Sequence, residues 1–139
     1  MSTISFKEFL LLQEKICPLI SDQQLKDLET FGDRLLAKFD IDIEFSKHFK
    51  ERMSDSRNDP CIVINEIQKL FKKIQKDKGK KVSSIFKQTD IEAILKDVEK
   101  ELNIPVVLRY DKKNDELDLV LKTIMRKKNF QSPNQSISY

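Results

Sequence analysis

One histidine and two arginines lie close together in the middle of the chain, and these residue types together could act on a phosphate group. His48 and Arg52 are four residues apart, so on a helix both side chains leave the same side, and Arg57 follows in a polar turn. An imidazole can transfer a proton near neutral pH, and guanidinium groups hold a phosphate and neutralise its developing charge. This chemistry suffices for metal-free cleavage of RNA by its own 2′-hydroxyl. The alternative is a structural histidine whose ring packs against Phe45 or Phe49.

A second cluster of polar residues lies near the end of the chain, in the sequence KTIMRKKNF at positions 122–130. It supplies a hydroxyl and four cations at the end of an expected strand: Thr123 with Lys122, Arg126, Lys127 and Lys128. These groups would suit a phosphate, although lysines also protect the edge of a sheet against aggregation. Arg109 and Tyr110 on the neighbouring strand are further candidates, of which one must face away because strand residues alternate.

Charge is distributed unevenly along the chain. Residues 1–45 contain 5 Lys/Arg and 9 Asp/Glu, whereas residues 46–139 contain 21 and 14, a net charge of +7. A basic body favours an anionic partner, and we expect nucleic acid, RNA rather than DNA. Solvated lysine-rich helices have the same composition and are the alternative. The candidate nucleic-acid contacts are Lys72, Lys73, Arg109, Lys122, Lys127 and Lys128.

Composition excludes several classes of protein and site. The 139 residues fit one domain, and the longest apolar runs have four residues, far below the roughly 20 that a membrane helix needs. The two glycines, Gly32 and Gly79, cannot form a phosphate-binding glycine loop. One histidine and two distant cysteines lack the spacing of a metal site, so we expect no metal and no cofactor. We expect Cys17 and Cys61 to be reduced and buried, with a disulfide as the alternative.

The periodicity of apolar residues predicts helices first and a sheet last. Helices are expected over 4–16, over 22–38 with Ser21 and Gln24 as a capping box, over 45–54, and from about 62 to a C-cap at Gly79. Residues 41–45 fit a short strand or a lead into the next helix, and 82–102 fit a helix or a strand. Two β-rich segments around a turn at 112–115 predict a hairpin.

These elements predict an α+β fold, with N-terminal helices followed by a C-terminal antiparallel β-sheet. We divide the chain into an N-terminal helical extension (1–44), an α+β domain (45–130) and a flexible polar tail (131–139).

Two blocks of this sequence resemble a family of small uncharacterised proteins of contractile-tailed phages. The blocks are HFKERMSDSRN at 48–58, which follows the pattern HFxxRxxDxRN, and MRKKNF at 125–130. The opening SFKEFLLLQE also resembles the leaders of such phage proteins, and Leu12-Gln13-Glu14 matches the L-x-E core of prohead-protease sites, with Lys15 departing from the small residue that follows it there. The resemblance implies a protein of the host cytoplasm, the phage virion or both, without a membrane partner.

More distantly, the helix with H-x-x-x-R, the basic helix and the terminal sheet resemble the barnase–EndoU–colicin–RelE nuclease fold, whose members cut RNA without metal. This resemblance implies that His48 is the acid/base group, that Arg52 and Arg57 bind phosphate, and that Thr123 and Arg126 complete the site. The expected function is therefore a metal-independent ribonuclease. The alternative is a non-enzymatic virion protein that binds nucleic acid or capsid and tail components, and an inhibitor of a host protein is a third possibility.

Overall fold

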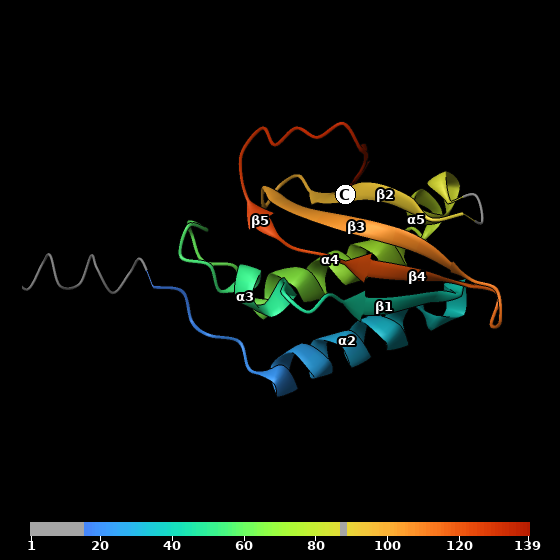
Figure 1. Ribbon diagram of the computed structural model, residues 1–139, viewed down its shortest axis with the longest axis horizontal. Coiled ribbons are helices and arrows are strands. Elements are labelled where there is room, and N and C mark those ends of the chain that lie inside the picture. Colours follow the sequence, from blue (N-terminus) through green and yellow to red (C-terminus); the bar gives the residue numbers. More distant parts are fainter. Residues whose placement is uncertain (1–15, 87–88) are drawn as a thin grey trace, which may run out of the picture.

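The computed structural model describes residues 16–86 and 89–139, in which helices lie against a mixed β-sheet (Figure 1). The helices are α2 (Asp22–Leu36), the 3-10 helix η1 (Ala37–Phe39), α3 (Phe49–Met53), α4 (Ile64–Lys76) and α5 (Lys80–Ile85). The strands are β1 (Ile41–Phe45), β2 (Ile91–Asp97), β3 (Leu102–Asp111), β4 (Glu116–Leu121), β5 (Met125–Arg126) and β6 (Gln135–Ser138). The helix expected over 4–16 and the protease-like site at 12–15 lie outside the described residues.

The α+β class is confirmed, but the sheet is not purely antiparallel. Its strand order is β1-β4-β3-β2-β6, with β5 paired to β3. β3 runs antiparallel to β2, β4 and β5, whereas β1 is parallel to β4 and β6 is parallel to β2. The two outer strands reach the sheet from distant parts of the chain, so no tight turn requires them to pair antiparallel.

The core lies between one face of the sheet and helices α2 and α4. Ile43, Leu119 and Leu108 lie side by side on β1, β4 and β3, and each is fully buried. The predicted apolar stripe of α4 covers this face with four fully buried residues: Ile67, Leu70, Phe71 and Ile74. In Figure 1, α4 runs behind the strands and α2 lies along β1. Burial of these stripes is the main stabilising contribution to the fold.

Helix α2 begins and packs as its sequence predicts. Ser21 Oγ accepts a hydrogen bond from the Gln24 backbone N–H at 3.0 Å, and Gln24 Oε1 accepts one from Ser21 N–H at 2.9 Å, which completes the capping box. Gly32 lies where α2 meets β1 and α4, because a Cβ there would be 2.9 Å from side-chain atoms of both Ile43 and Phe71. Residues 22–44 therefore belong to the same core as the rest, and our separation of 1–44 from 45–130 was wrong for this part.

Two further predictions of secondary structure are wrong, and one open alternative is resolved. The helix expected over 45–54 is only Phe49–Met53, because Phe45 ends β1 and pairs with Leu121. Residues 91–97 form a strand, since both neighbouring strands supply hydrogen bonds to it. The tail is not flexible throughout: residues 135–138 form β6, and Ile137 is buried opposite Leu95.

The expectation of reduced cysteines is wrong, because Cys17 and Cys61 form a disulfide. The fold brings the segment before α2 beside the segment before α4, although the two cysteines are 44 residues apart. Sequence separation therefore says nothing about this pairing. The expected C-cap at Gly79 is wrong, because α4 ends at Lys76 and its C-cap is Asp77. Gly79, whose backbone is left-handed (φ 67°), is instead the N-cap of α5.

Candidate functional site

The first wall of the candidate site is α3 with the turn that follows it. Phe49 and Met53 are fully buried and anchor this short helix on the core, so that His48 and Arg52 lie on its solvent side. The Arg52 N–H donates to the His48 carbonyl at 3.1 Å, which keeps the two side chains one helical turn apart. Their side chains are 69% and 54% exposed. The structural alternative for His48, a ring packed into the core, is therefore not what the structure has.

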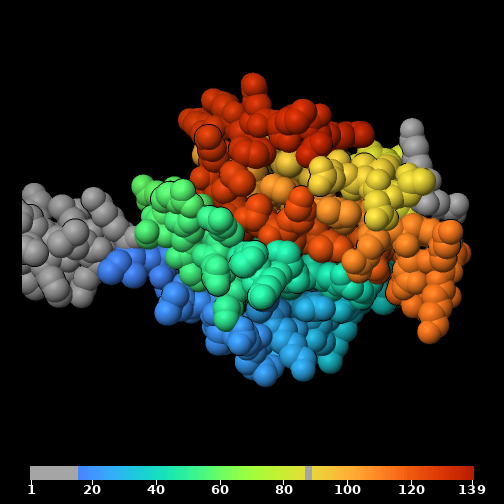
Figure 2. All heavy atoms as spheres, in the orientation of Figure 1, coloured from blue at the N-terminus to red at the C-terminus, as the bar shows by residue number. Residues whose placement is uncertain are grey.

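The second wall is the segment that follows β4. Ser46 N–H donates to the Leu121 carbonyl at 2.9 Å, and Lys122 N–H donates to the Pro105 carbonyl at 2.9 Å, so the chain leaves β4 beside the start of the first wall. Buried Ile124 then anchors the segment and leaves its neighbours toward solvent. Figure 2 shows the green atoms around α3 next to the orange-red atoms of the chain beyond β4.

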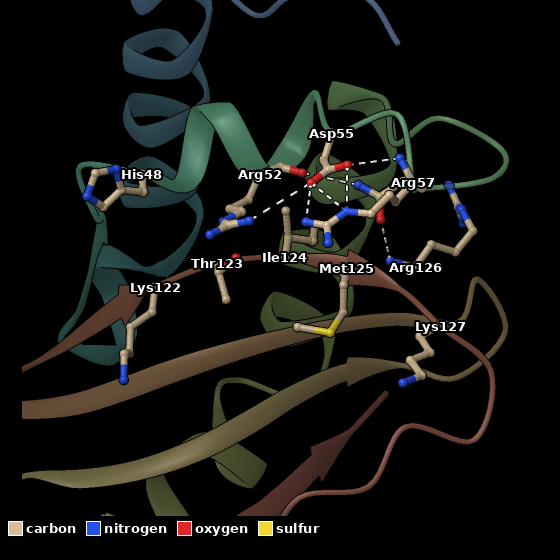
Figure 3. Close-up of a pocket in the computed structure, with 11 residues that line it drawn as sticks. His48, Arg52, Asp55, Arg57, Lys122, Thr123, Ile124, Met125, Arg126 and Lys127 are labelled. Atoms are coloured by element: carbon tan, nitrogen blue, oxygen red, sulfur yellow. Dashed lines mark hydrogen bonds and ion pairs between the residues drawn. The ribbon is translucent and has the colours of Figure 1, made fainter. Parts of the chain in front are cut away.

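The two walls enclose an open pocket of about 780 Å³. Its lining contains all five residues that the nuclease resemblance assigns to the site: His48, Arg52, Arg57, Thr123 and Arg126. Lys122 and Lys127 line it too, together with Asp55, Asn58, Ile124 and Met125. Figure 3 shows that the cationic groups of Arg52, Arg57, Lys122 and Lys127 are spread across the pocket, and that His48 lies at one end of it. Segments about 70 residues apart in sequence thus form one cationic surface.

Asp55 organises the two arginines of the first wall. The Arg57 side chain donates to both Asp55 carboxylate oxygens, at 2.7 Å from Nη2 and 3.1 Å from Nε, and its backbone N–H donates at 2.9 Å. Arg52 Nη1 lies 4.0 Å from the same carboxylate. These contacts with Arg57 lower the pKa of Asp55 to about 2, so the carboxylate is ionised at neutral pH and is not a proton donor there. Arg57 is nevertheless 78% exposed and keeps a solvent-facing edge.

Arg126 is among the lining residues, but its guanidinium is occupied by contacts within the protein. It donates to the carbonyls of Pro60 (2.9 Å) and Lys100 (2.6 Å) and to the Glu66 carboxylate (2.6 Å), and its side chain is only 8% exposed. Glu66 also accepts from Val63 N–H at 3.2 Å at the start of α4. The geometry therefore favours Arg126 as a positioning residue that joins three segments, whereas its role as a phosphate ligand stays a prediction.

Asn58 is the residue that sequence reasoning missed. It is buried, its Oδ1 accepts from the Arg126 backbone N–H at 2.9 Å, and its Nδ2 donates to the Arg52 carbonyl at 3.1 Å. One side chain thus connects the two walls of the pocket. The signal was present in the sequence, because Asn58 closes the HFxxRxxDxRN block, but its composition suggested only a turn.

Several predicted nucleic-acid contacts lie elsewhere on the molecule. Lys73 pairs with buried Asp97 at 3.0 Å, and the Lys72 amine lies 6.0 Å from the centre of the Phe31 ring. Arg109 pairs with Glu44 at 2.6 Å and with Asp118 at 3.2 Å, and it is not among the residues that line the pocket. Lys128 lines a second, smaller pocket. The structure therefore brings Lys122 and Lys127 to the candidate site and does not bring Lys72, Lys73, Arg109 or Lys128 there.

Acidic residues collect around the β3–β4 hairpin, away from the pocket. Burial and the neighbouring carboxylate of Asp33 raise the pKa of Asp42 to about 7, and burial also raises the pKa of Glu116. Among the described residues, Asp111, Glu116 and Asp118 have ligand oxygens within 4.8 Å of one another. Carboxylates at this spacing occur commonly without an ion, so this cluster by itself does not define a metal site.

Within residues 16–86 and 89–139, none of the helices combines the length and apolar character needed to span a bilayer. Comparisons of the chain with protein-family models, with curated proteins and with solved structures found no match.

Proposed function

We propose that the pocket between α3 and the segment beyond β4 binds the phosphate backbone of RNA. The observation that carries this proposal is the convergence of cations from both walls, Arg52 and Arg57 on one and Lys122 and Lys127 on the other, around a single pocket. Asp55 is the one acidic residue among the lining residues, and it pairs with Arg57. Lys122 also pairs with Glu92 outside the lining, at 3.2 Å, but both side chains of this pair are exposed. One arginine guanidinium can donate hydrogen bonds to two phosphate oxygens at once, and lysine adds positive charge.

The spread of these cations favours a polymer over a small anion. Groups that bind one phosphate converge on one point, whereas the side chains in Figure 3 present separate charges along the pocket. A strand with one phosphate per nucleotide matches such an arrangement. The net charge of +7 over residues 46–139 supports the approach of a polyanion at longer range.

Binding is tested by fluorescence anisotropy with a labelled ten-nucleotide oligouridine at several salt concentrations. We expect affinity to fall with salt, and the double variant Arg52→Ala/Lys122→Ala to bind at least tenfold more weakly. Its salt dependence should also be flatter, by about 0.7 in log–log slope for each phosphate that the variant no longer neutralises. The matched control is Lys112→Ala/Lys113→Ala, which removes the same charge from the exposed hairpin turn between β3 and β4. Equal affinities of the two double variants would contradict the proposal.

Cleavage of the bound RNA is a second candidate, favoured by the exposed His48 ring in the lining of the same pocket. In this reaction the 2′-hydroxyl attacks the adjacent phosphorus and the bond to the 5′-oxygen of the next nucleotide breaks. His48 accepts the proton of the 2′-hydroxyl and passes it to the leaving 5′-oxygen, which leaves a 2′,3′-cyclic phosphate and a free 5′-hydroxyl. Asp55 does not act as the second acid, because it stays ionised. Glu51, whose carboxylate lies 3.6 Å from His48 Nδ1, is the neighbouring group that orients the ring.

Cleavage is tested by incubating end-labelled RNA with the protein in EDTA and separating the products on a gel. We expect fragments ending in a cyclic phosphate with the wild type, none with His48→Ala, and unchanged oligouridine affinity for that variant. RNA that stays intact with the wild type would contradict cleavage but not binding. The protein would then fit the non-enzymatic alternative given in the sequence analysis.

A further inference from the structure

A second pocket of about 300 Å³ lies next to the first and shares Lys127 with it. It is formed by the end of β2 with the turn before β3, and by the segment after β5. Lys127 therefore borders both pockets. An RNA strand bound in the first pocket that continues along this residue reaches the second.

The second pocket combines positive charge with an aromatic ring. Lys96, Lys127 and Lys128 line it, and Phe130 lies at the end of the segment. The Lys96 ammonium donates to the Phe130 carbonyl at 2.8 Å and lies 5.9 Å from the centre of the ring, which holds this residue at the pocket. Phe130 is partly exposed and does not belong to the hydrophobic core, so its ring is not fully enclosed by the protein.

The acidic residues of this pocket do not cancel its positive charge. Asp97 is buried and paired with Lys73 at 3.0 Å. Glu101 is the remaining carboxylate of the lining, against three lysines. A cationic hollow with an accessible aromatic ring is the arrangement by which proteins bind unpaired nucleotides, since the cations hold the backbone and the ring stacks on a base.

We propose that RNA bound in the first pocket is single-stranded and continues past Lys127, so that one of its bases stacks on Phe130 in the second pocket. This inference rests on the proposed function and specifies its substrate class. A base within a duplex has both faces covered by its neighbours, so only an unpaired nucleotide can offer a face to the ring.

The test compares Phe130→Ala, Phe130→Leu and Phe130→Tyr in the full chain, by anisotropy with a labelled ten-nucleotide oligouridine and with a blunt RNA duplex of ten base pairs. We expect Phe130→Ala and Phe130→Leu to weaken single-strand binding about tenfold, and Phe130→Tyr to bind as the wild type does, because it keeps the aromatic face. Leucine keeps the apolar volume, so the comparison isolates the ring. Duplex affinity should not change, and thermal unfolding should show an unchanged Tm.

The outcomes separate the two proposals. Wild-type protein that does not bind oligouridine overturns both. If the wild type binds and Arg52→Ala/Lys122→Ala weakens binding, while Phe130→Ala has no effect or weakens the duplex equally, then the proposed function stands and stacking on Phe130 is wrong.

Discussion

Arg126 is predicted from its charge to bind phosphate, but in the structure its guanidinium contacts other parts of the protein. Its guanidinium reaches two carbonyls and the Glu66 carboxylate while remaining nearly buried. Lysine at this position would offer one ammonium in place of a planar fork and could not satisfy the same set of acceptors. The residue holds the segment before α4 against β5, and the shape of the pocket depends on that contact.

We therefore expect Arg126→Ala to lower the free energy of unfolding by about 3 kcal/mol, because it leaves Glu66 without its partner in a nearly buried position. Urea denaturation of Arg126→Ala, Glu66→Gln and the double variant gives the coupling between the two residues. Additive losses in this cycle would show that the ion pair contributes nothing of its own.

Asp42 gives a pH dependence of stability whose sign follows from its raised pKa. Burial and Asp33 raise the pKa from the usual 3.8 to about 7 in the folded state, so the folded protein holds a proton that the unfolded chain releases. Stability from this group is complete below pH 4 and is lost as pH rises through 7. We expect Asp42→Asn, which imitates the protonated form, to raise Tm more at pH 8 than at pH 5. Equal gains at the two pH values in calorimetry would contradict this assignment.

At the scale of elements, the disulfide connects the segment before α2 to the segment before α4. Cys61 is adjacent to Pro60, whose carbonyl accepts a hydrogen bond from Arg126, so the same segment also contacts the second wall of the pocket. The link restricts the unfolded chain over 44 residues and thereby stabilises the fold.

Replacing both cysteines by serine should lower the free energy of unfolding by about 2–4 kcal/mol. Adding dithiothreitol to the wild type should give the same loss in a denaturant titration, and the double variant should not respond to it. A wild type whose stability is indifferent to the reductant would show that this bond does not restrict the chain.

The contact of α2 with β1 and α4 depends on Gly32. Alanine would improve the intrinsic helix propensity, but its Cβ would be 2.9 Å from fully buried side chains on both sides. We expect Gly32→Ala to lower the free energy of unfolding by about 1–3 kcal/mol. Thr30→Ala, on the exposed side of the same helix, is the control and should not destabilise the protein in the same urea titration.

At the scale of the whole molecule, the cationic pocket and the carboxylate cluster lie at different ends of the sheet. The pocket lies beside α3 and the ends of β1 and β4, whereas Asp111, Glu116 and Asp118 lie toward the β3–β4 hairpin at the opposite end in Figure 1. Lysines also occur at that end, in the turn at Lys112 and Lys113 and in α5, so positive charge alone does not distinguish the pocket from the rest of the surface.

NMR titration with unlabelled oligouridine tests whether RNA binds at the pocket end of the molecule. We expect chemical-shift changes in the backbone amides of residues 48–58 and 122–130, and none at the hairpin turn 112–115. Shifts concentrated at the hairpin would contradict the proposed location of the RNA, whether or not the RNA is cleaved.

Several features of this protein follow from local sequence patterns alone. The capping box at Ser21, the apolar stripe of α4 and the hairpin around the turn at 112–115 each depend on neighbours within a few residues, and all three are confirmed. His48 and Arg52 were identifiable from helical spacing, and Arg57, Thr123 and Arg126 from the polar segments in which they lie. The nuclease resemblance joined the five into one site, and the structure brings all five to one pocket.

Only the tertiary structure decided the features that depend on distant segments. These are the strand over 91–97, the parallel pairing of β1 and β6, and the disulfide. The tertiary structure also distinguished Arg126, which supports the pocket, from Arg52 and Arg57, which face solvent in it. The charge of a side chain is known from the sequence. The groups that pair with it come from distant segments, which only the folded structure brings into contact, so no local pattern predicts them.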